Sequence, residues 1–149
     1  MEIRPATPGD RGAVKALLEA AGLPSADLDE RLIRRFLVGE REGRVVGTVA
    51  YEPAGANNGL LRSLVVAPDW QGRGVGERLV AEIEAVARSQ GVRTLYLLTE
   101  TAEGFFDRLG YIATDRQQAP AEVRATSEFT ELCPAGAACM RKDLGQNIQ

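Results

Sequence analysis

The strongest chemical signal in the chain is a group of three glycines, Gly72, Gly74 and Gly76, that separates two apolar segments. Leucine and valine dominate residues 60–66 before the group, and apolar residues recur at helical spacing after it. Because glycine has no Cβ, the backbone of residues 71–76 can curl until several N–H groups point the same way, at the positive end of the following helix. This pattern predicts an anion site, and a pyrophosphate is the anion we expect there.

Two other phosphate-binding motifs do not match this segment. A P-loop has Lys followed by Ser or Thr after its last glycine, whereas Glu77 and Arg78 follow Gly76 here. The dinucleotide-binding fingerprint spaces its glycines differently and opens its fold, whereas this strand follows other expected strands. An ordinary glycine-rich loop remains the alternative to a phosphate site.

The order Gln71-x-x-Gly74-x-Gly76 after a strand ending near Val66 resembles the GNAT superfamily of N-acetyltransferases. Residues 99–111 resemble the short helix and following strand of the same family, in the expected order along the chain. The resemblance implies an α/β (α+β) fold: one acyl-CoA N-acyltransferase domain with a mixed, mostly antiparallel sheet of six to seven strands flanked by helices. We expect this domain over residues 1–144, with a flexible C-terminal end at 145–149.

The resemblance also implies acetyl-CoA as co-substrate, with no metal. Backbone amides of residues 71–76 would bind the pyrophosphate, and the backbone of a bulged strand at 64–66 would bind the pantetheine and thioester. The cofactor-binding residues implied in this way are Val65, Val66, Gln71, Gly72, Arg73, Gly74, Val75, Gly76, Thr99 and Phe106.

The expected reaction is attack of a neutral amine on the acetyl carbonyl, followed by departure of the CoA thiolate. Positioning of the reactants supplies about 7–11 kcal/mol, and a backbone N–H aimed at the oxyanion supplies roughly 3–4 kcal/mol more. We expect the N–H groups near Leu64 to act as these oxyanion donors. Glu100 is the expected catalytic carboxylate, with Glu52 and Glu128 as further candidates, and a solvated surface acid is the alternative for each.

Three features of the sequence limit the available acid–base chemistry. The chain contains no histidine, so histidine-dependent triads and zinc sites are excluded. Phe106 stands where many GNAT enzymes have a tyrosine that protonates the thiolate, and phenylalanine has no proton to donate. A CoA thiolate can nevertheless leave with little help. Thr99 stands where the family often has asparagine, and its hydroxyl can hydrogen-bond either to the pantetheine or to a helix end.

Arg62, Arg124 and Ser127 are the expected substrate-binding residues. If Arg62 projects opposite Arg124, the two guanidinium groups can hold a small acidic amine through bidentate contacts. The alternative is that both are surface arginines paired with nearby acids. Residues 116–144 resemble the arsenic-resistance branch of the superfamily, which is related to amino-acid N-acetyltransferases. This resemblance implies an amino-acid-like substrate, either organoarsenical or glutamate-like.

The sequence therefore predicts an acetyl-CoA-dependent N-acetyltransferase that acts on a small amine. Two alternatives stay open: acetylation of a peptide or protein amine, and a non-catalytic acyl-CoA sensor. Cys133 and Cys139 are expected to pack as small apolar residues, with arsenic binding by the two thiols as the alternative.

Composition agrees with one globular domain of 149 residues, because 44% of the chain is hydrophobic and 26% is charged. A net charge of −3 gives no broad attraction to nucleic acid. The N-terminus has no apolar run typical of a secretion signal or membrane helix. We expect a cytoplasmic monomer or homodimer with no nucleic-acid or membrane partner.

Hydrophobic periodicity and turn residues predict the elements that position these groups. A helix is expected from a Thr7 cap to Gly22, and a second helix is expected to include Phe36. A hairpin is expected to turn at Glu42-Gly43, with a loop over 53–59. The expected strands are 3–5, 37–40, 44–51, 60–66, 93–99, 111–114 and 137–144; further helices are expected at 74–90 and 102–109, with a polar helical or loop section at 119–131.

Overall fold

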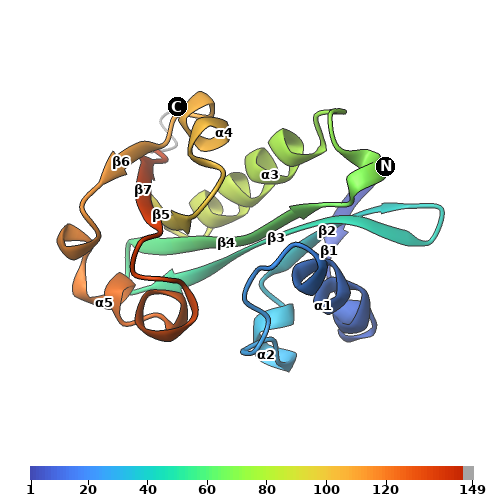
Figure 1. The fold of residues 1–149 in the computed structure, drawn as a ribbon, viewed down its shortest axis with the longest axis horizontal. Coiled ribbons are helices and arrows are strands. Elements are labelled where there is room, and N and C mark those ends of the chain that lie inside the picture. Colours follow the sequence, from blue (N-terminus) through green and yellow to red (C-terminus); the bar gives the residue numbers. More distant parts are fainter. Residues whose placement is uncertain (146–149) are drawn as a thin grey trace. The chain divides into compact units, whose positions relative to one another are not determined.

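The structure is a computed structural model that describes residues 1–145. Seven strands in this part of the chain form a mixed sheet in the order β1-β2-β3-β4-β5-β7-β6 (Figure 1). The strands are β1 (Glu2–Pro5), β2 (Phe36–Arg41), β3 (Arg44–Ala54), β4 (Asn58–Val66), β5 (Thr94–Thr99), β6 (Ile112–Thr114) and β7 (Ala138–Asp143). The expected fold class, a mostly antiparallel sheet flanked by helices, is confirmed.

The helices are of very different lengths, and several are single turns. The α-helices are α1 (Arg11–Ala20), α2 (Glu30–Ile33), α3 (Val75–Ser89), α4 (Glu103–Arg108) and α5 (Ala121–Arg124). Short 3₁₀ turns are η1 (Pro8–Asp10), η2 (Pro68–Trp70) and η3 (Arg116–Gln118), and η4 (Glu128–Leu132) is a π-helix. None of the helices described between residues 1 and 145 is long and apolar enough to cross a membrane.

Two compact units can be distinguished along the chain. The first unit contains Met1–Tyr51 and Arg62–Ala85, and the second contains Glu52–Leu61 and the residues from Val86 onward. The chain passes between them within β3, within β4 and within α3. The glycine loop, residues 71–76, lies in the first unit, whereas Thr99, Glu100 and Phe106 lie in the second.

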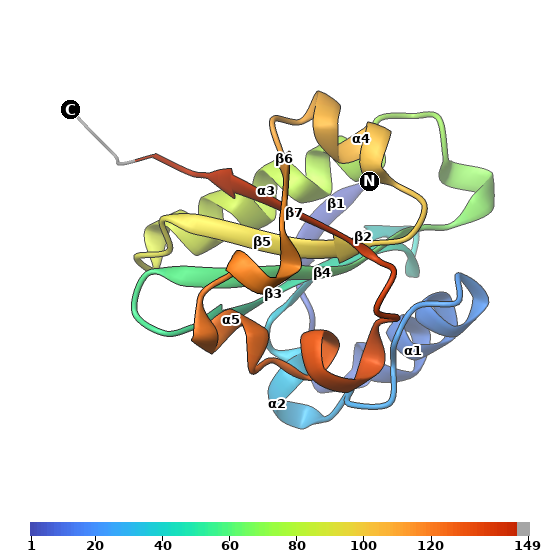
Figure 2. The same ribbon diagram turned by 60° about the vertical axis from the view of Figure 1, so that its left-hand side comes forward.

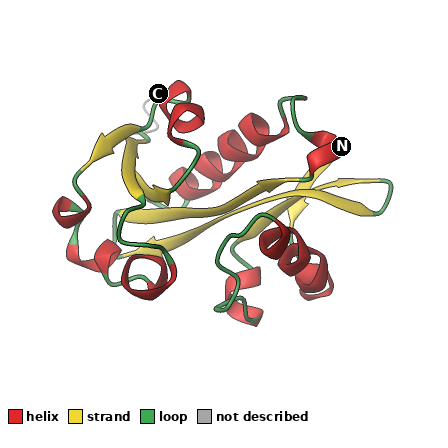
Figure 3. Ribbon diagram, viewed as in Figure 1, coloured by secondary structure: helices red, strands yellow, loops and turns green. Residues whose placement is uncertain are grey.

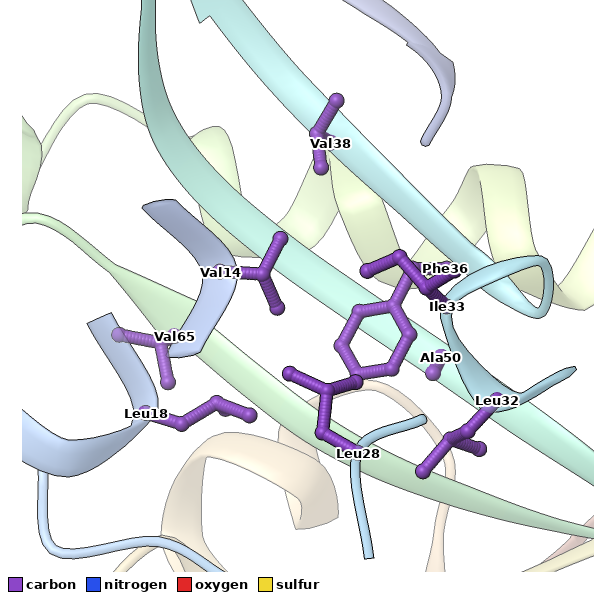
Figure 4. Close-up of a cluster of buried hydrophobic side chains, with 9 residues drawn as sticks. All are labelled: Val14, Leu18, Leu28, Leu32, Ile33, Phe36, Val38, Ala50 and Val65. Carbon is purple, nitrogen blue, oxygen red and sulfur yellow. The ribbon is translucent and has the colours of Figure 1, made fainter. Parts of the chain in front are cut away.

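The first unit is a layered structure of helices on both faces of its strands. β1 pairs antiparallel with β2, and β2 pairs antiparallel with β3. Figures 1 and 2 show α1 and α2 on one face of these strands and α3 on the other. The first face carries a buried cluster whose side chains converge from two helices, the segment between them and three strands (Figure 4). Its members are Val14, Leu18, Leu28, Leu32, Ile33, Phe36, Val38, Ala50 and Val65.

The second unit contains the only parallel pairing for which a register is defined among the described strands. β4 pairs with β5 over Asn58–Leu60 and Thr94–Tyr96, and the pairing ends there although both strands continue. β7 pairs antiparallel with β5 along its whole length and with β6 on its other side. The buried cluster of this unit consists of Ala54, Leu60, Tyr96, Ala119, Val123, Phe129 and Cys139.

Most of the predicted elements are confirmed. The predicted turn of the first hairpin is also confirmed, because Glu42 and Gly43 both have positive φ, 52° and 80°. The C-terminal end that we expected to be flexible lies almost entirely outside the described residues, which stop at Gly145.

Two predictions about element boundaries are wrong. The second helix ends at Ile33, and Phe36 begins β2, where it pairs with Ala50 and is buried in the first cluster. Apolar spacing fits a helix and a short buried strand equally well, and pairing with β3 decides for the strand. The loop over 53–59 is shorter than expected, because β3 continues to Ala54 and β4 begins at Asn58. Pairing with β5 extends β4 into a segment of low strand propensity.

The start of α1 is stabilised by a charged network around Asp10. The Asp10 carboxylate accepts a hydrogen bond from the Thr7 backbone N–H at 2.7 Å and two from the Arg4 guanidinium at 2.8 and 3.0 Å. Hydrogen bonds from Arg4 and the Thr7 backbone lower the pKa of Asp10 from 3.8 to about 2. Arg4 also donates to Glu40 at 2.7 Å, which links β1, β2 and the helix start.

We predict that Asp10→Asn destabilises the protein at neutral pH but not at pH 2. The folded-state pKa is depressed, so the ionised carboxylate stabilises the fold above pH 4, and this contribution is lost as pH falls toward 2. After allowance for partial screening, the expected loss is about 1–2 kcal/mol of unfolding free energy at pH 7. Urea unfolding at both pH values measures it. Equal destabilisation of the variant at pH 7 and pH 2 would contradict the assignment.

Candidate active site

The backbone of β4 departs from strand geometry at Ser63, which has a positive φ of 62°. A left-handed conformation is uncommon for a residue with a Cβ, and in the middle of a strand it breaks the regular ladder. The Ser63 carbonyl oxygen accepts a hydrogen bond from the Thr48 hydroxyl of β3 at 2.8 Å. The strand is therefore kinked immediately before residues 64–66, where the sequence predicts the oxyanion donor and the pantetheine site.

The side chains around the kink form a buried polar network. Arg62 is 3% exposed, and its terminal nitrogens donate to the two carboxylate oxygens of Asp27 at 2.6 and 2.9 Å. The Arg62 Nε donates to the Ser63 hydroxyl oxygen at 3.0 Å. Thr48, Ser63 and Arg62 are all buried, so hydrogen bonds offset the cost of removing these polar groups from water.

After β4 the chain makes the 3₁₀ turn η2 and enters the glycine loop, as the helical turn and following loop in Figure 3 show. The Ala67 N–H donates to the Val46 carbonyl at 2.8 Å, which holds the end of β4 to β3. The Gln71 side-chain amide donates to the Val66 carbonyl at 3.1 Å. Gln71 therefore closes the loop against the strand with its side chain, and its backbone N–H donates to the Pro68 carbonyl at 3.4 Å.

Gly72 and Gly74 have left-handed backbones, with φ of +78° and +79°. Beyond the adjoining backbone, no atom lies within 4 Å of the position that a Cβ would occupy at either glycine, so the conformation, rather than space, requires glycine there. α3 begins directly afterwards at Val75, and the Arg78 N–H makes the first helical bond to the Gly74 carbonyl. The N–H groups of the first helical turn have no acceptor within the helix. Gly76 lies inside that turn and is buried.

The surroundings of the loop are rich in arginine. The Arg73 guanidinium lies over the Trp70 ring, 4.7 Å from its centroid. Arg44, at the start of β3, makes a bidentate pair with Asp69 at 2.7 and 3.0 Å. Hydrogen bonds from Arg44 hold the pKa of Asp69 below its usual value. Arg73 and Arg78 are exposed beside the helix N-terminus, and the exposed carboxylate of Glu77 lies in the same first turn of α3.

The expected cofactor residues of the second unit lie around α4. The Thr99 hydroxyl accepts a hydrogen bond from the Ala102 N–H at 3.0 Å, which is the helix-end contact foreseen from the sequence. Glu100 is exposed on the bend after β5. Phe106 is 5% exposed and packs edge-on against Phe105 and Tyr111. The cofactor-binding roles of Thr99 and Phe106 and the catalytic role of Glu100 stay predictions.

The expected substrate residues of the second unit lie around α5 and η4. Arg124 is exposed, and its Nε donates to the Ala119 carbonyl at 2.9 Å. Ser127 is half-buried and immediately precedes the π-helix. Glu128, a further carboxylate candidate, is buried, and the Cys133 thiol lies 3.7 Å from its Oε1. π-Helical turns occur often at functional sites, which agrees with the prediction of substrate-binding residues in this segment.

The two cysteines differ in their surroundings. Cys139 is buried on β7, and burial raises the pKa of its thiol to about 11. Cys133 is half-buried, and its thiol is the one that lies near the Glu128 carboxylate. Within residues 1–145, no group of three or more His, Cys, Asp or Glu side chains is arranged to hold a metal ion.

Sequence reasoning missed three residues of the first unit. Asp27, Thr48 and Ser63 form the network with Arg62, but none belongs to a recognisable motif. The available signal was the pair Arg62-Ser63, which interrupts an apolar strand with two polar residues. Such residues inside a buried strand require partners.

Comparison with known proteins assigns the family. Residues 33–113 match the family model described as "Acetyltransferase (GNAT) domain", and this segment includes both β4 and the glycine loop. The chain belongs to the GNAT acetyltransferase family.

Similar proteins include amino-acid acetyltransferases that are much longer than this chain. The "Amino-acid acetyltransferase" of Ectopseudomonas mendocina is 36% identical over 126 residues, which cover 80% of this chain and 29% of that protein. The N-acetylglutamate synthase from Neisseria gonorrhoeae, solved with coenzyme A and N-acetyl-glutamate, superposes with a TM-score of 0.85 at 28% identity. That match covers 97% of this chain and 35% of the synthase.

A protein of similar size shares the whole fold. Rv2747 from Mycobacterium tuberculosis, solved in complex with CoA, has a TM-score of 0.81 at 24% identity, covering 96% of this chain and 99% of that one. At this identity the likeness establishes the fold alone.

We predict that Cys133 reacts with a thiol reagent in the folded protein much faster than Cys139. The raised pKa of Cys139, about 11 against an ordinary 9.0, lowers its thiolate fraction about 100-fold at pH 8. Timed reaction with an aromatic disulfide reagent should show one fast thiol, which is lost in Cys133→Ser and kept in Cys139→Ser. Equal rates for both thiols in the folded protein would contradict the burial of Cys139.

Proposed function

We propose that this chain transfers the acetyl group of acetyl-CoA to the amine of a small, amino-acid-like substrate. The observation that carries the proposal is the backbone of one continuous segment: a strand kinked at Ser63 leads into left-handed Gly72 and Gly74 and then into the N-terminus of α3. This segment offers a row of backbone donors rather than a set of reactive side chains. Such a row suits a ligand with a pyrophosphate and a thioester.

The proposed cofactor site uses the backbone of the glycine loop for the pyrophosphate. The exposed guanidinium of Arg73 adds positive charge beside the helix N-terminus. Residues 64–66 bind the pantetheine and thioester, and the resemblance to GNAT enzymes supports the same assignment. In the second unit, Thr99 and Phe106 stay the proposed cofactor residues. A location in the cytoplasm is part of the proposal, because acetyl-CoA is available there.

In the proposed reaction the substrate nitrogen attacks the acetyl carbonyl carbon and forms a new C–N bond. The carbonyl oxygen becomes an oxyanion that the Leu64 N–H stabilises. Collapse of this intermediate breaks the C–S bond, and the CoA thiolate leaves with both electrons of that bond. The amine proton passes to solvent or to a carboxylate, for which Glu100 is the proposed acceptor because it is exposed to water.

The thiolate leaves without a protein acid in this proposal. Phe106 carries no proton, and a thiol of ordinary pKa makes a tolerable leaving group near neutral pH. Phe106 is packed against Tyr111, so its proposed contribution is an apolar surface for the cofactor.

The proposed substrate is an amino acid with an acidic group. Support comes from the relatives named as amino-acid acetyltransferases and from the synthase solved with N-acetyl-glutamate. Arg124 and Ser127 are the proposed contacts for the substrate carboxylate. Arg62 belongs to the same proposal, although its two terminal nitrogens already hold Asp27. The resemblance to the arsenic-resistance branch extends the candidates to organoarsenical amino acids.

A panel of amines tests the proposal directly. Purified protein is incubated with acetyl-CoA and glutamate-like, organoarsenical and neutral amino acids, polyamines or short peptides, and the release of CoA thiol is recorded. We expect release to depend on an acidic amino acid, and Arg124→Ala to raise KM for it about 10-fold or more. Turnover only with peptides would favour a peptide acetyltransferase. Acetyl-CoA binding without turnover on any amine would favour a sensor.

We predict that Gly74→Ala weakens acetyl-CoA binding at least about 10-fold, because a Cβ disfavours the left-handed φ that aims the loop amides. Gly91→Ala is the matched control: Gly91 also has positive φ, +92°, and open space around it, but it lies beyond the other end of α3. Both variants should lose similar stability, about 1–2 kcal/mol. Calorimetric titration with CoA measures the affinities. Equal affinities for the two variants would contradict the assignment of the glycine loop to the cofactor site.

A further inference from the structure

We propose that Thr48 and Asp27 are positioning residues that aim the Leu64 N–H at the acetyl group. This inference rests on the proposed function and adds to it the side chains that hold the reactive backbone in place. The two residues lie at opposite ends of a hydrogen-bonded chain that runs from Thr48 through Ser63 and Arg62 to Asp27. All four belong to the first unit.

The link from Thr48 to the reaction is the peptide bond between Ser63 and Leu64. A peptide unit is planar and trans, so the Ser63 carbonyl and the Leu64 N–H point in opposite directions within the same peptide plane. The Thr48 hydroxyl donates to that carbonyl at 2.8 Å and is itself fully buried. By fixing the Ser63 carbonyl oxygen, Thr48 also fixes the direction of the Leu64 N–H on the other side of the peptide plane.

The plane of this peptide needs such a restraint because Ser63 is in a strained conformation. The left-handed region is unfavourable for a residue with a Cβ, which persists there only when its surroundings enforce it. Ser63 is held through two oxygens: its carbonyl accepts from Thr48, and its hydroxyl accepts from the Arg62 Nε at 3.0 Å. Loss of either contact lets the peptide plane rotate toward ordinary strand geometry, and the Leu64 N–H rotates with it.

Asp27 acts one step further away, through the rigid guanidinium of Arg62. The guanidinium is planar, so fixing its two terminal nitrogens also fixes the direction of Nε. Asp27 holds both of those nitrogens, at 2.6 and 2.9 Å, and the Arg62 side chain has no exposed surface. Asp27 lies on the segment between α1 and α2, and its side chain is 24% exposed. This segment therefore helps to set the geometry of the β4 kink.

The first experiment compares Thr48→Val with Thr48→Ser. Valine keeps the shape of threonine but has no hydroxyl, whereas serine keeps the hydroxyl. We expect Thr48→Val to lower kcat about 10-fold or more, with the Kd for acetyl-CoA within about twofold of wild type. Thr48→Ser should restore most of kcat. A parallel loss in both variants would show that packing rather than the hydrogen bond matters, and would overturn the role of Thr48.

A second readout does not need turnover. The infrared stretch of the carbonyl in bound [1-¹³C]acetyl-CoA falls in frequency when a donor hydrogen-bonds to the oxygen. We expect a low frequency in wild type and Thr48→Ser, and a higher frequency in Thr48→Val, in which the donor is misdirected. If wild type binds acetyl-CoA and shows turnover but all three frequencies agree, this inference fails and the proposed function stands. If wild type does not bind acetyl-CoA, both fail.

The second experiment tests Asp27→Asn against Glu40→Gln. Each substitution neutralises the carboxylate partner of an arginine in the first unit, but Glu40 pairs with Arg4, outside the network. We expect Asp27→Asn to lower kcat about threefold to tenfold and to raise the carbonyl frequency, while Glu40→Gln changes neither. A lower KM for an acidic amino acid in Asp27→Asn, with kcat unchanged, would instead make Asp27 a competitor of the substrate carboxylate for Arg62, and would overturn its positioning role.

Discussion

The geometry of β4 depends on a single strained residue held by its neighbours. Ser63 takes up a left-handed backbone inside a strand, and buried hydrogen bonds to its carbonyl and hydroxyl keep it there. Without them the strand would run straight and its next N–H groups would continue the ladder. The chain accepts a local free-energy penalty to turn backbone groups out of the sheet, which is a common way for folds to create reactive surfaces.

The same logic extends down the chain from the kink. The end of β4 is held to β3 by the Ala67 N–H, and the Gln71 side chain closes the following loop against Val66. Two left-handed glycines then bring the chain into α3. The first unit thus contains a continuous stretch in which the direction of backbone groups is set residue by residue, and the helices and hydrophobic cluster around it supply the rigidity.

The sequence predicted the parts of this arrangement that repeat along the chain. Apolar periodicity located the long helix α3 and the central strands, and the three glycines located the loop. It failed at Phe36, because a short apolar run does not distinguish a helix from a strand until its partner strand is known. It also missed Asp27 and Thr48, which are distant from Arg62 in sequence and become partners only through folding. The left-handed backbone of Ser63 could not be predicted from its residue type, because serine does not favour a positive φ.

The glycine loop has an evolutionary consequence. In the proposed site its donors are main-chain groups that every residue type except proline provides, so the donors themselves tolerate side-chain changes in the loop, provided that Gly72 and Gly74 remain. Recognition of an amine by side chains has no such tolerance, because one substitution replaces the chemical group that makes the contact. A protein built in this way can exchange one acceptor for another over a few mutations while its donor site stays constant. Divergence among such relatives should therefore concentrate on the acceptor amine rather than on the acetyl donor.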